Sequence, residues 1–391
     1  MEKIEMFKNT EIAFKWFNDK ELKRAYFLMK TISKPWLVKI GKYLSNIALS
    51  IHFPINWIVK PTIYNHFVGG ETIEECLPLV RKLEKYNVKA VLDYSVEGSE
   101  DETKINQALE ETLKTIYNAK KDPNIPFTVF KPSAFGIPQV LTKASENIEL
   151  SKWEKKEIEK FRQRVYTLCK TAYENDIPIM IDAEECAYQK IVDEVIYEMM
   201  LQFNKNQAIV YNTLQMYRRD RLDFLKFLLE QAKKDKIKIG IKFVRGAYIE
   251  KERERAKKLG YPDPIHPTKE ETDKAYNAAI EYSIEHINVI SIFNATHNEY
   301  STYLMTQLME KKGLEKTDPR CYFSQLYGMS DHITFNLAQL GYNVAKYIPY
   351  GPVRHVLPYL IRRTEENTSV AGQTPRELWL IEQEFKRRKM V

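Results

Sequence analysis

One stretch of the sequence organises its interpretation: Tyr347-Ile-Pro-Tyr-Gly-Pro-Val-Arg-His-Val-Leu-Pro-Tyr-Leu-Ile-Arg-Arg-Thr-Glu-Glu-Asn367. Its first residues predict the end of a strand, followed by a turn from Pro349 to Pro352. Apolar residues then recur at helical spacing, which predicts a helix. We expect Pro358 to lie in the first turn of that helix, where a missing backbone N–H is tolerated.

The polar residues of this predicted helix share one face. Tyr359, Arg362, Arg363 and Glu366 are spaced at i, i+3, i+4 and i+7, which places them on one side of a helix. Two neighbouring guanidinium groups backed by a carboxylate suit bidentate binding of a small carboxylate in a dry pocket. The same pattern is typical of a solvated helix face with two ion pairs, and these four residues alone favour that interpretation. The rest of the chain has to decide between the carboxylate-binding pocket and the solvated helix face.

Composition excludes several classes of protein. The chain has 391 residues, 44% of them hydrophobic, which is enough for one large domain or two ordinary ones. The excess of 60 basic over 53 acidic residues is mild, so nucleic acid is not an expected partner. A basic cluster at Lys386–Lys389 is interpreted as a solvated tail, with an anionic membrane surface as the alternative. Four cysteines without a C-x-x-C motif indicate a reducing compartment and neither zinc nor a redox pair.

The N-terminal region carries no targeting or spanning signal that we recognise. Glu2 and Glu5 interrupt any signal-peptide pattern. No run of about 18 apolar residues predicts a transmembrane helix. Residues 36–59 are apolar but interrupted by polar residues, which predicts one or two amphipathic helices. We expect residues 1–66 to form a helical arm, with Pro54 and Pro61 as breaks.

After this arm, short apolar segments alternate regularly with helical ones. Eight strands and eight following helices of this kind favour a closed (β/α)8 barrel, and their span fits the usual barrel size of about 250 residues. An open doubly wound sheet remains an alternative, but no G-x-G-x-x-G motif or P-loop follows any strand. We expect the barrel to occupy residues 67–373 and a basic helical tail residues 374–391. The predicted strands are Val88–Tyr94, Phe127–Lys131, Pro178–Asp182, Ala208–Asn212, Ile237–Val244, Asn288–Asn294, Tyr322–Leu326 and Val344–Ile348.

Polar residues recur where these strands end, the position of active sites in such barrels. Because several strand ends carry them together, one shared site is expected. No zinc-protease motif or G-x-S-x-G elbow occurs, so no metal site is predicted, and His297 is expected to be a hydrogen-bonding residue. Lys131 and Asp182 could pair, although a buried lysine could also form a Schiff base as in aldolases. The strand-end residues are Asp93-Tyr94, Lys131, Asp182-Ala-Glu184, Asn212 with the nearby Gln215, Lys242 with Arg245, Asn294-Ala-Thr-His-Asn298, Ser324-Gln325 and Tyr347.

With these motifs in place, the chain resembles the proline dehydrogenases, the flavoenzymes that open proline catabolism. The resemblance runs in order from about Phe67 to Gln373. It implies a distorted barrel whose last helix lies over the barrel mouth, and an FAD bound across the strand ends without a Rossmann domain. The matching blocks are Phe67-Val-Gly-Gly-Glu71, Ile181-Asp-Ala-Glu-Glu185, Lys242-Phe-Val-Arg-Gly-Ala-Tyr248, Gly260-Tyr-Pro-Asp-Pro264, Ala295-Thr-His-Asn298 and Tyr359-Leu-Ile-Arg-Arg-Thr-Glu-Glu-Asn367.

The resemblance also implies roles for the residues of the opening stretch. Arg362 and Arg363 match the pair that clamps the substrate carboxylate, and Glu366 matches the acid that steadies them. Tyr347 and Tyr359 match the aromatic walls over the proline ring. The bulk of Tyr347 implies a preference for proline over hydroxyproline.

Further matches surround the flavin. Lys131 and Asp182 match a lysine and an aspartate beside the flavin and substrate. Lys242 matches a basic residue that faces the flavin N5 atom, where some family members have arginine. The other cofactor contacts implied are Gln215 or its competitor Asn212 at the ring edge, together with Val244, Gly246, Ala247, Thr296, His297, Asn298 and Gln325.

The activity implied is oxidation of L-proline to Δ1-pyrroline-5-carboxylate, by hydride transfer from proline C5 to FAD N5. Electrons then pass to a quinone, and a separate pyrroline-5-carboxylate dehydrogenase acts next. We expect a cytoplasmic protein that contacts the inner face of the membrane peripherally, through the basic tail or the N-terminal arm. Two alternatives stay open: a Schiff-base lyase with Lys131 as nucleophile, and a non-enzymatic binding protein with a relic site.

Overall fold

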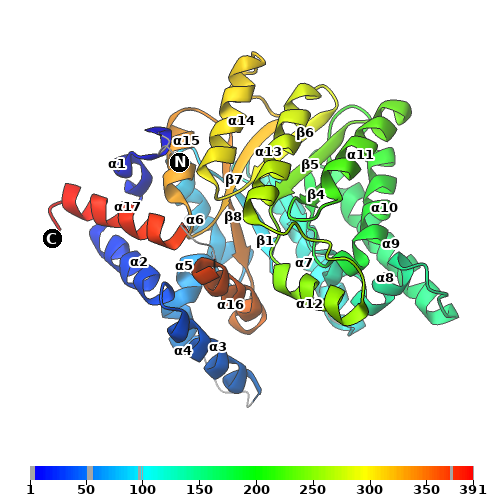
Figure 1. The fold of residues 1–391 in the computed structure, drawn as a ribbon, viewed down its shortest axis with the longest axis horizontal. Helices are drawn as coiled ribbons and strands as arrows, with labels where there is room; N and C mark the ends of the chain where they lie inside the picture. The colour runs from blue at the N-terminus through cyan, green and yellow to red at the C-terminus, as the bar shows by residue number, and fades with distance from the viewer. Residues whose placement is uncertain (1–4, 51–55, 96–97, 99, 370–372, 391) are drawn as a thin grey trace. The chain divides into compact units, whose positions relative to one another are not determined.

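The computed structural model describes residues 5–50, 56–95, 98, 100–369 and 373–390, without the side chains of 44–50, 58, 365–369 and 373. The strands are hydrogen-bonded in sequential order and close into one barrel (Figure 1). Their register is parallel in each pair resolved, for example β1 with β8 and β4 with β5. The predicted closed (β/α)8 barrel is therefore confirmed. The strands are β1 (Lys89–Tyr94), β2 (Phe127–Phe130), β3 (Ile179–Ile181), β4 (Val210–Gln215), β5 (Ile239–Val244), β6 (Ile290–Ala295), β7 (Cys321–Leu326) and β8 (Val344–Tyr350).

The chain divides into two compact units, Val96–Phe323 and the combination of Met1–Ser95 with Ser324–Val391. We call them the central unit and the terminal unit. The predicted boundaries at residues 66 and 373 do not coincide with this division, and they stay a prediction.

The central unit contains β2 to β6 and the helices that follow them. Local signals set several helix starts: α9 begins with a capping box in which Ser151 and Glu154 bind each other's backbone N–H groups. The pattern did not predict the short elements η3 and α8. The helices are α7 (Glu102–Lys121), η3 (Pro132–Ala134), α8 (Pro138–Ser145), α9 (Lys152–Glu174), α10 (Cys186–Phe203), α11 (Arg221–Asp235), α12 (Ile249–Leu259), α13 (Lys269–Glu285) and α14 (Glu299–Lys311).

The terminal unit joins both ends of the described chain to β1 and β8. Among its described residues, no helix is both long and apolar enough to cross a bilayer. Its helices are η1 (Glu5–Phe7), α1 (Thr10–Phe14), α2 (Asp19–Ile32), α3 (Pro35–Ser50), α4 (Asn56–Val59), the π-helical turn η2 (Lys60–Tyr64), α5 (Asn65–Phe67), α6 (Ile73–Glu84), α15 (Asp331–Gln339), α16 (Val353–Ser369) and α17 (Gln373–Arg387).

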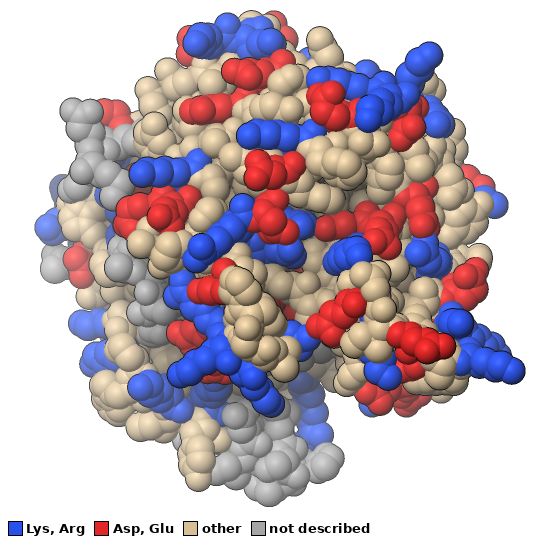
Figure 2. Space-filling view, turned by 45° about the vertical axis from the view of Figure 1, so that its right-hand side comes forward, with Lys and Arg blue, Asp and Glu red and all other residues tan. Residues whose placement is uncertain are grey.

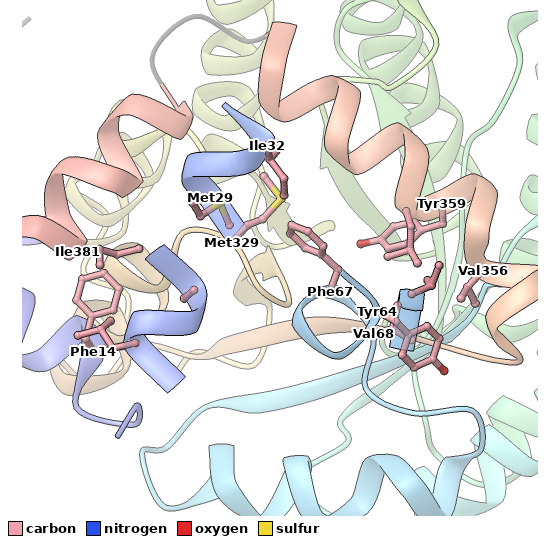
Figure 3. Close-up of a cluster of buried hydrophobic side chains, with 14 of the residues drawn as sticks. Phe14, Met29, Ile32, Tyr64, Phe67, Val68, Met329, Val356, Tyr359 and Ile381 are labelled. Atoms are coloured by element: carbon pink, nitrogen blue, oxygen red, sulfur yellow. The ribbon is translucent and has the colours of Figure 1, made fainter. Parts of the chain in front are cut away.

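One hydrophobic cluster holds the terminal unit together. Side chains from α1, α2, α5, α16 and α17 meet in it, including Phe14, Met29, Phe67, Tyr359 and Ile381 (Figure 3). Burying an aliphatic or aromatic side chain stabilises a fold by roughly 1.5–3 kcal/mol. Helices from the two ends of the chain therefore depend on each other for stability.

The C-terminal basic cluster is not a solvated tail, because its arginines bind this unit. Arg388 donates hydrogen bonds to the carbonyl oxygens of Phe14 and Phe17, at 2.8 and 3.0 Å, and to Glu384 Oε1 at 2.7 Å. Arg387 also donates to Glu384, which is fully buried. The interpretation as a free basic end is wrong at these two arginines.

Proline placement differs from the prediction at two positions. Pro358 is the sixth residue of α16 and not in its first turn. A proline inside a helix costs about 3 kcal/mol, because it removes a backbone hydrogen bond and its ring clashes with the preceding turn, but fully buried Val356, Leu357 and Leu360 offset this. Pro61 does not break the arm, since it lies in the π-helical turn between α4 and α5. Pro54 lies outside the described residues.

Strand β4 also differs from the prediction. We expected it to end at Asn212, but it continues to Gln215. Thr213 and Gln215 interrupt the apolar run, yet both pair in register with β5, at Lys242 and Val244. These polar residues break the apolar pattern, so the sequence did not predict the last part of the strand.

Candidate active site

Three charged residues of the central unit, which follow β2, follow β3 and lie on β5, come together; we call them the Asp182 cluster. Lys242 Nζ, on β5, donates a hydrogen bond to Asp182 Oδ1 at 2.6 Å. Lys131 Nζ lies 3.8 Å from Asp182 Oδ2. The three side chains are only 5–16% exposed. The predicted pairing of Lys131 with Asp182 is present, but Lys242 is the nearer partner.

A buried carboxylate beside this cluster, Glu184, was among the strand-end residues of the sequence but received no role in the predicted site. Glu184 accepts hydrogen bonds from the backbone N–H and the hydroxyl of Ser133, at 2.8 and 2.7 Å. Burial raises the pKa of the Glu184 carboxyl above its usual range, and the bonds from Ser133 oppose that rise. Ser133 belongs to the turn η3 that follows Lys131, so Glu184 fixes the backbone next to that lysine. Its spacing two residues after Asp182 was the available signal.

The two candidates on β4 lie on opposite sides of the strand. Asn212 Nδ2 donates to Asp193 Oδ1 at 3.0 Å, and Asp193 belongs to α10, which packs outside the strands. Gln215 is three residues further on and therefore faces the other side. Thr213, on that side, pairs in register with Lys242. Gln215 thus shares a face with the Asp182 cluster, and Asn212 faces the helices.

Arg245, just past the end of β5, is part of the scaffold at these loops. Its guanidinium donates to Asp273 at 2.8 Å, to the Thr296 hydroxyl at 2.5 Å and to the Ser301 hydroxyl at 2.9 Å. It also lies 4.3 Å from the centre of the Tyr276 ring. These contacts tie the loop after β5 to the loop after β6, where the predicted residue Thr296 lies.

The remaining predicted cofactor contacts of the central unit lie on these two loops. Gly246 has φ +120°, and a Cβ there would come within 2.6 Å of the Tyr217 ring, so only glycine fits. Asn298 caps α14 by accepting a hydrogen bond from the Ser301 backbone N–H. Val244 and His297 are half-buried, and Ala247 is exposed.

The arginine-rich helix α16 lies in the terminal unit. Arg363 is only 7% exposed, and its guanidinium carbon lies 5.3 Å from the centre of the Tyr359 ring. Tyr359 is 8% exposed and packs in the hydrophobic cluster. A fully solvated helix face does not fit this burial. Arg362 is half-buried, and the side chain of Glu366 lies outside the described residues.

Two further predicted residues of this unit are buried on strands. Tyr347 on β8 is 6% exposed, and its carbonyl oxygen accepts a hydrogen bond from the Tyr327 backbone N–H at 2.9 Å. Gln325 on β7 accepts a hydrogen bond from the Thr334 hydroxyl at 2.8 Å. Within the described part of the chain, no group of three or more His, Cys, Asp or Glu side chains is arranged to hold a metal ion.

Fold and site together define a (β/α)8-barrel protein with buried charge at its strand ends, the position at which such barrels carry their active sites. Residues 76–376 match the family model described as proline dehydrogenase, and the chain therefore belongs to the proline dehydrogenase family. The resemblance seen in the sequence motifs is thereby confirmed.

The individual relatives of the chain differ in their names. The chain is 38% identical to the carbapenem antibiotics biosynthesis protein CarD of Pectobacterium carotovorum subsp. carotovorum, covering 82% of this chain and 83% of that protein. It is 31% identical to the mitochondrial proline dehydrogenase 1 of Dictyostelium discoideum, covering 94% of this chain and 72% of that protein.

Solved structures support the same fold. Proline utilization A (PutA) from Bdellovibrio bacteriovorus, inactivated by N-propargylglycine, has a TM-score of 0.72 and 22% identity. The match covers 95% of this chain but only 40% of that protein. At this identity the likeness supports the barrel fold alone.

Proposed function

We propose that this protein oxidises L-proline to Δ1-pyrroline-5-carboxylate, with FAD as hydride acceptor and a quinone as the next electron acceptor. Membership of the family supports the substrate and the reaction class. The observation that carries the proposal is the burial of Arg363 against Tyr359 on α16. A buried guanidinium beside an aromatic ring suits an amino acid that combines a carboxylate with an apolar ring.

The residues of the central unit are compatible with a bound flavin. The side-chain oxygen of Gln215 is buried and has no hydrogen-bond partner among the described residues, although it faces the same side as Lys242. A buried acceptor of this kind costs free energy unless a ligand donor meets it, and a flavin ring edge offers such donors. Gly246 has no side chain, so the loop after β5 can pass close to the Tyr217 ring. The side-chain oxygen of Asn212 is also buried without a partner in the described part of the chain, so it is the strand face shared with Lys242 that favours Gln215 over Asn212 as the contact at the ring edge.

Flavin, when bound, supplies the hydride acceptor for this chemistry. The chain's own residues would position the substrate and exclude water. Arg362 and Arg363 would bind the proline carboxylate, with Glu366 supporting them, and Tyr347 and Tyr359 would confine the ring. Lys242 is held in place by Asp182, and Lys131 by the turn that Glu184 anchors. Such fixed positioning is a large part of the rate enhancement in reactions of this kind.

The proposal extends to specificity and to the next enzyme. The Tyr347 side chain, buried on β8, would disfavour a ring that carries a 4-hydroxyl group, so proline should be preferred over hydroxyproline. The product would pass to a separate pyrroline-5-carboxylate dehydrogenase. Comparable turnover of proline and hydroxyproline would contradict this specificity.

Anaerobic addition of proline to the purified protein tests the proposal. The flavin absorbance should bleach with the wild type. Arg363→Ala should keep the cofactor but need at least a hundredfold more proline, because removing a desolvated charge partner costs roughly 3–5 kcal/mol. Arg354→Ala, on the exposed part of the same helix, is the matched control and should behave as wild type.

Two outcomes would contradict the proposal. One is a purified protein without flavin, and the other is equal proline sensitivity of Arg363→Ala and the wild type. Trapping of a Lys131 adduct by borohydride would instead support the Schiff-base lyase.

A further inference from the structure

The loop of residues 182–185, which joins β3 to α10, has no regular secondary structure of its own. Contacts with other segments of the central unit hold it instead. Asp182 binds Lys242 on β5, and Glu184 binds Ser133 in the turn η3. The position of the Asp182 carboxylate therefore depends on what fixes this loop.

Two consecutive residues of α12 hold the far end of the loop. Lys251 Nζ donates a hydrogen bond to Glu185 Oε1 at 2.8 Å. Glu252 Oε1 accepts a hydrogen bond from the backbone N–H of Cys186, the first residue of α10, at 2.7 Å. Because α12 is the helix that follows β5, it connects the end of that strand to the loop after β3.

The contact with Glu252 replaces a local cap of α10. The residue before this helix, Glu185, makes no side-chain hydrogen bond to the backbone of the first turn. A helix start leaves backbone N–H groups unpaired, and its partial positive charge favours a carboxylate. Glu252, 66 positions further along the chain, supplies that carboxylate.

The two contacts from α12 differ in their burial. Lys251 and Glu185 have side chains that are 61% and 26% exposed, and exposed ion pairs contribute little. Such charges are common here: on the face drawn in Figure 2, acidic and basic side chains are interspersed over much of the surface. Glu252, by contrast, is 1% exposed, and no lysine or arginine among the described residues forms an ion pair with it. We therefore expect Glu252 to hold the loop more firmly than Lys251 does.

We propose that Glu252 is a positioning residue, which caps α10 and thereby fixes the loop that places the Asp182 carboxylate against Lys242. The inference rests on the proposed function, in which Asp182 and Lys242 lie beside the flavin. It adds a residue that acts only through its neighbours. Without the cap the loop would shift, and a displacement of about 1 Å can slow a positioned reaction by roughly a hundredfold.

Substitutions on α12 separate the cap from the helix that carries it. Glu252→Ala removes the acceptor, whereas Glu252→Gln keeps one side-chain oxygen for the Cys186 N–H. In Glu252→Gln the amide NH2 replaces Oε2, which has no hydrogen-bond partner in the described part of the chain, so the bond to Cys186 can persist. Glu254→Ala replaces an exposed glutamate of the same helix and is the matched control. If Glu252→Ala does not fold, Glu252→Asp takes its place, because it keeps the charge on a shorter side chain.

Hydrogen exchange of the purified protein, followed by mass spectrometry, tests the cap directly. Backbone amides of residues 183–188 should exchange about tenfold faster in Glu252→Ala than in the wild type, because a hydrogen bond to a buried charge is lost. Glu252→Gln and Glu254→Ala should exchange like the wild type. This measurement does not depend on proline oxidation, so its outcome is separate from that of the proposed function.

Flavin reduction by proline tests the positioning role. In Glu252→Ala the rate at saturating proline should fall between about tenfold and a hundredfold. The proline concentration for half-maximal rate should change by less than about twofold, because the proposed carboxylate contacts lie on α16. Glu252→Gln should recover most of the rate, and Lys251→Ala should lose less than about twofold.

Three results would overturn the inference. The first is wild-type exchange of the loop amides in Glu252→Ala. The second is faster exchange confined to α12, which would limit Glu252 to the stability of its own helix. The third is normal flavin reduction in a variant whose loop amides exchange faster, because the loop would then not place Asp182. A wild-type protein that oxidises no proline would instead reject the proposed function, and exchange alone would decide whether Glu252 fixes the loop.

Discussion

Two buried lysines on two strands of the barrel have different surroundings. Lys346, on β8 of the terminal unit, is fully buried. Its Nζ lies 2.7 Å from Asp331 Oδ1 and donates to the carbonyl oxygens of Met329 and Leu326 at 2.5 and 3.4 Å. Lys242, on β5 of the central unit, is 4% exposed and donates to the carboxylate of Asp182.

The kinds of partner distinguish the two lysines more than their burial does. Two of the Lys346 partners are backbone oxygens, one at the last residue of β7 and one in the loop that follows it, so this ammonium group fixes that loop. Lys242 meets a side chain that also faces a second lysine, at 3.8 Å, and such a carboxylate can adjust to a ligand. We infer that Lys346 serves stability and that Lys242 serves the site.

The largest effect is expected from Lys346→Met. Asp331 would stay buried without its cation, and breaking a buried pair costs roughly 3–5 kcal/mol. Chemical denaturation should report this loss of unfolding free energy. The double variant Lys346→Met, Asp331→Asn should recover part of it, and Lys114→Met, which replaces an exposed lysine of α7, should change little. Unchanged stability in Lys346→Met would remove the distinction between the two lysines.

The second largest effect is expected at Glu377 of α17, whose carboxyl group interacts electrostatically with Lys346 and Asp331. Its Oε1 accepts a hydrogen bond from the Ser330 backbone N–H at 2.6 Å, and burial raises the pKa of its carboxyl to about 7. The folded protein therefore binds an extra proton between about pH 4.5 and 7. The stability that this group contributes is complete below that window and is lost as the pH rises through 7.

Glu377→Gln should remove this dependence on pH. Glutamine keeps an acceptor for Ser330 and carries no charge. The variant should match the wild type near pH 4.5 and exceed its unfolding free energy above pH 7, by up to about 3 kcal/mol. Unfolding curves at several pH values measure the difference, and parallel pH profiles of the two proteins would count against the raised pKa.

The smallest effect on stability is expected from Lys242→Met. Asp182 would retain Lys131 nearby and some contact with solvent, so the cost should be about 1–2 kcal/mol. Proline-dependent flavin bleaching should slow far more than this stability loss suggests, because the residue would face the cofactor. An unfolding cost equal to that of Lys346→Met, with unchanged bleaching, would reverse the assignment of roles.

Much of the fold could be predicted from periodicity alone. The predicted strands Val88–Tyr94 and Phe127–Lys131 differ from the observed β1 and β2 by one residue each. The barrel followed from counting strands, because alternating strands and helices leave few architectures. Errors occurred where tertiary contacts outweigh local preference. Pro358 continues a helix because its neighbours are buried, and Gln215 continues a strand because β5 provides pairing partners.

The site could be predicted only in part. Lys131, Asp182 and Lys242 were chosen as strand-end residues, and their proximity follows from parallel strands. The bond between Glu184 and Ser133 joins residues 51 positions apart, and no sequence pattern signals such a pair. The orientation of Asn212 toward α10 also required the strand register, which a shift of one residue would reverse.

The contact between the two ends of the chain has a consequence for synthesis. Arg388 binds the Phe14 carbonyl oxygen from 374 positions away in the sequence. Phe14, Leu22 and Met29 have their apolar partners on α16 and α17 among others, so part of their burial must wait until a ribosome has made nearly the whole chain. Domains usually fold as they emerge, but here α1 and α2 complete their packing only after α16 and α17 have been made. Until then, the apolar side chains of α1 and α2 that face α16 and α17 lack those partners.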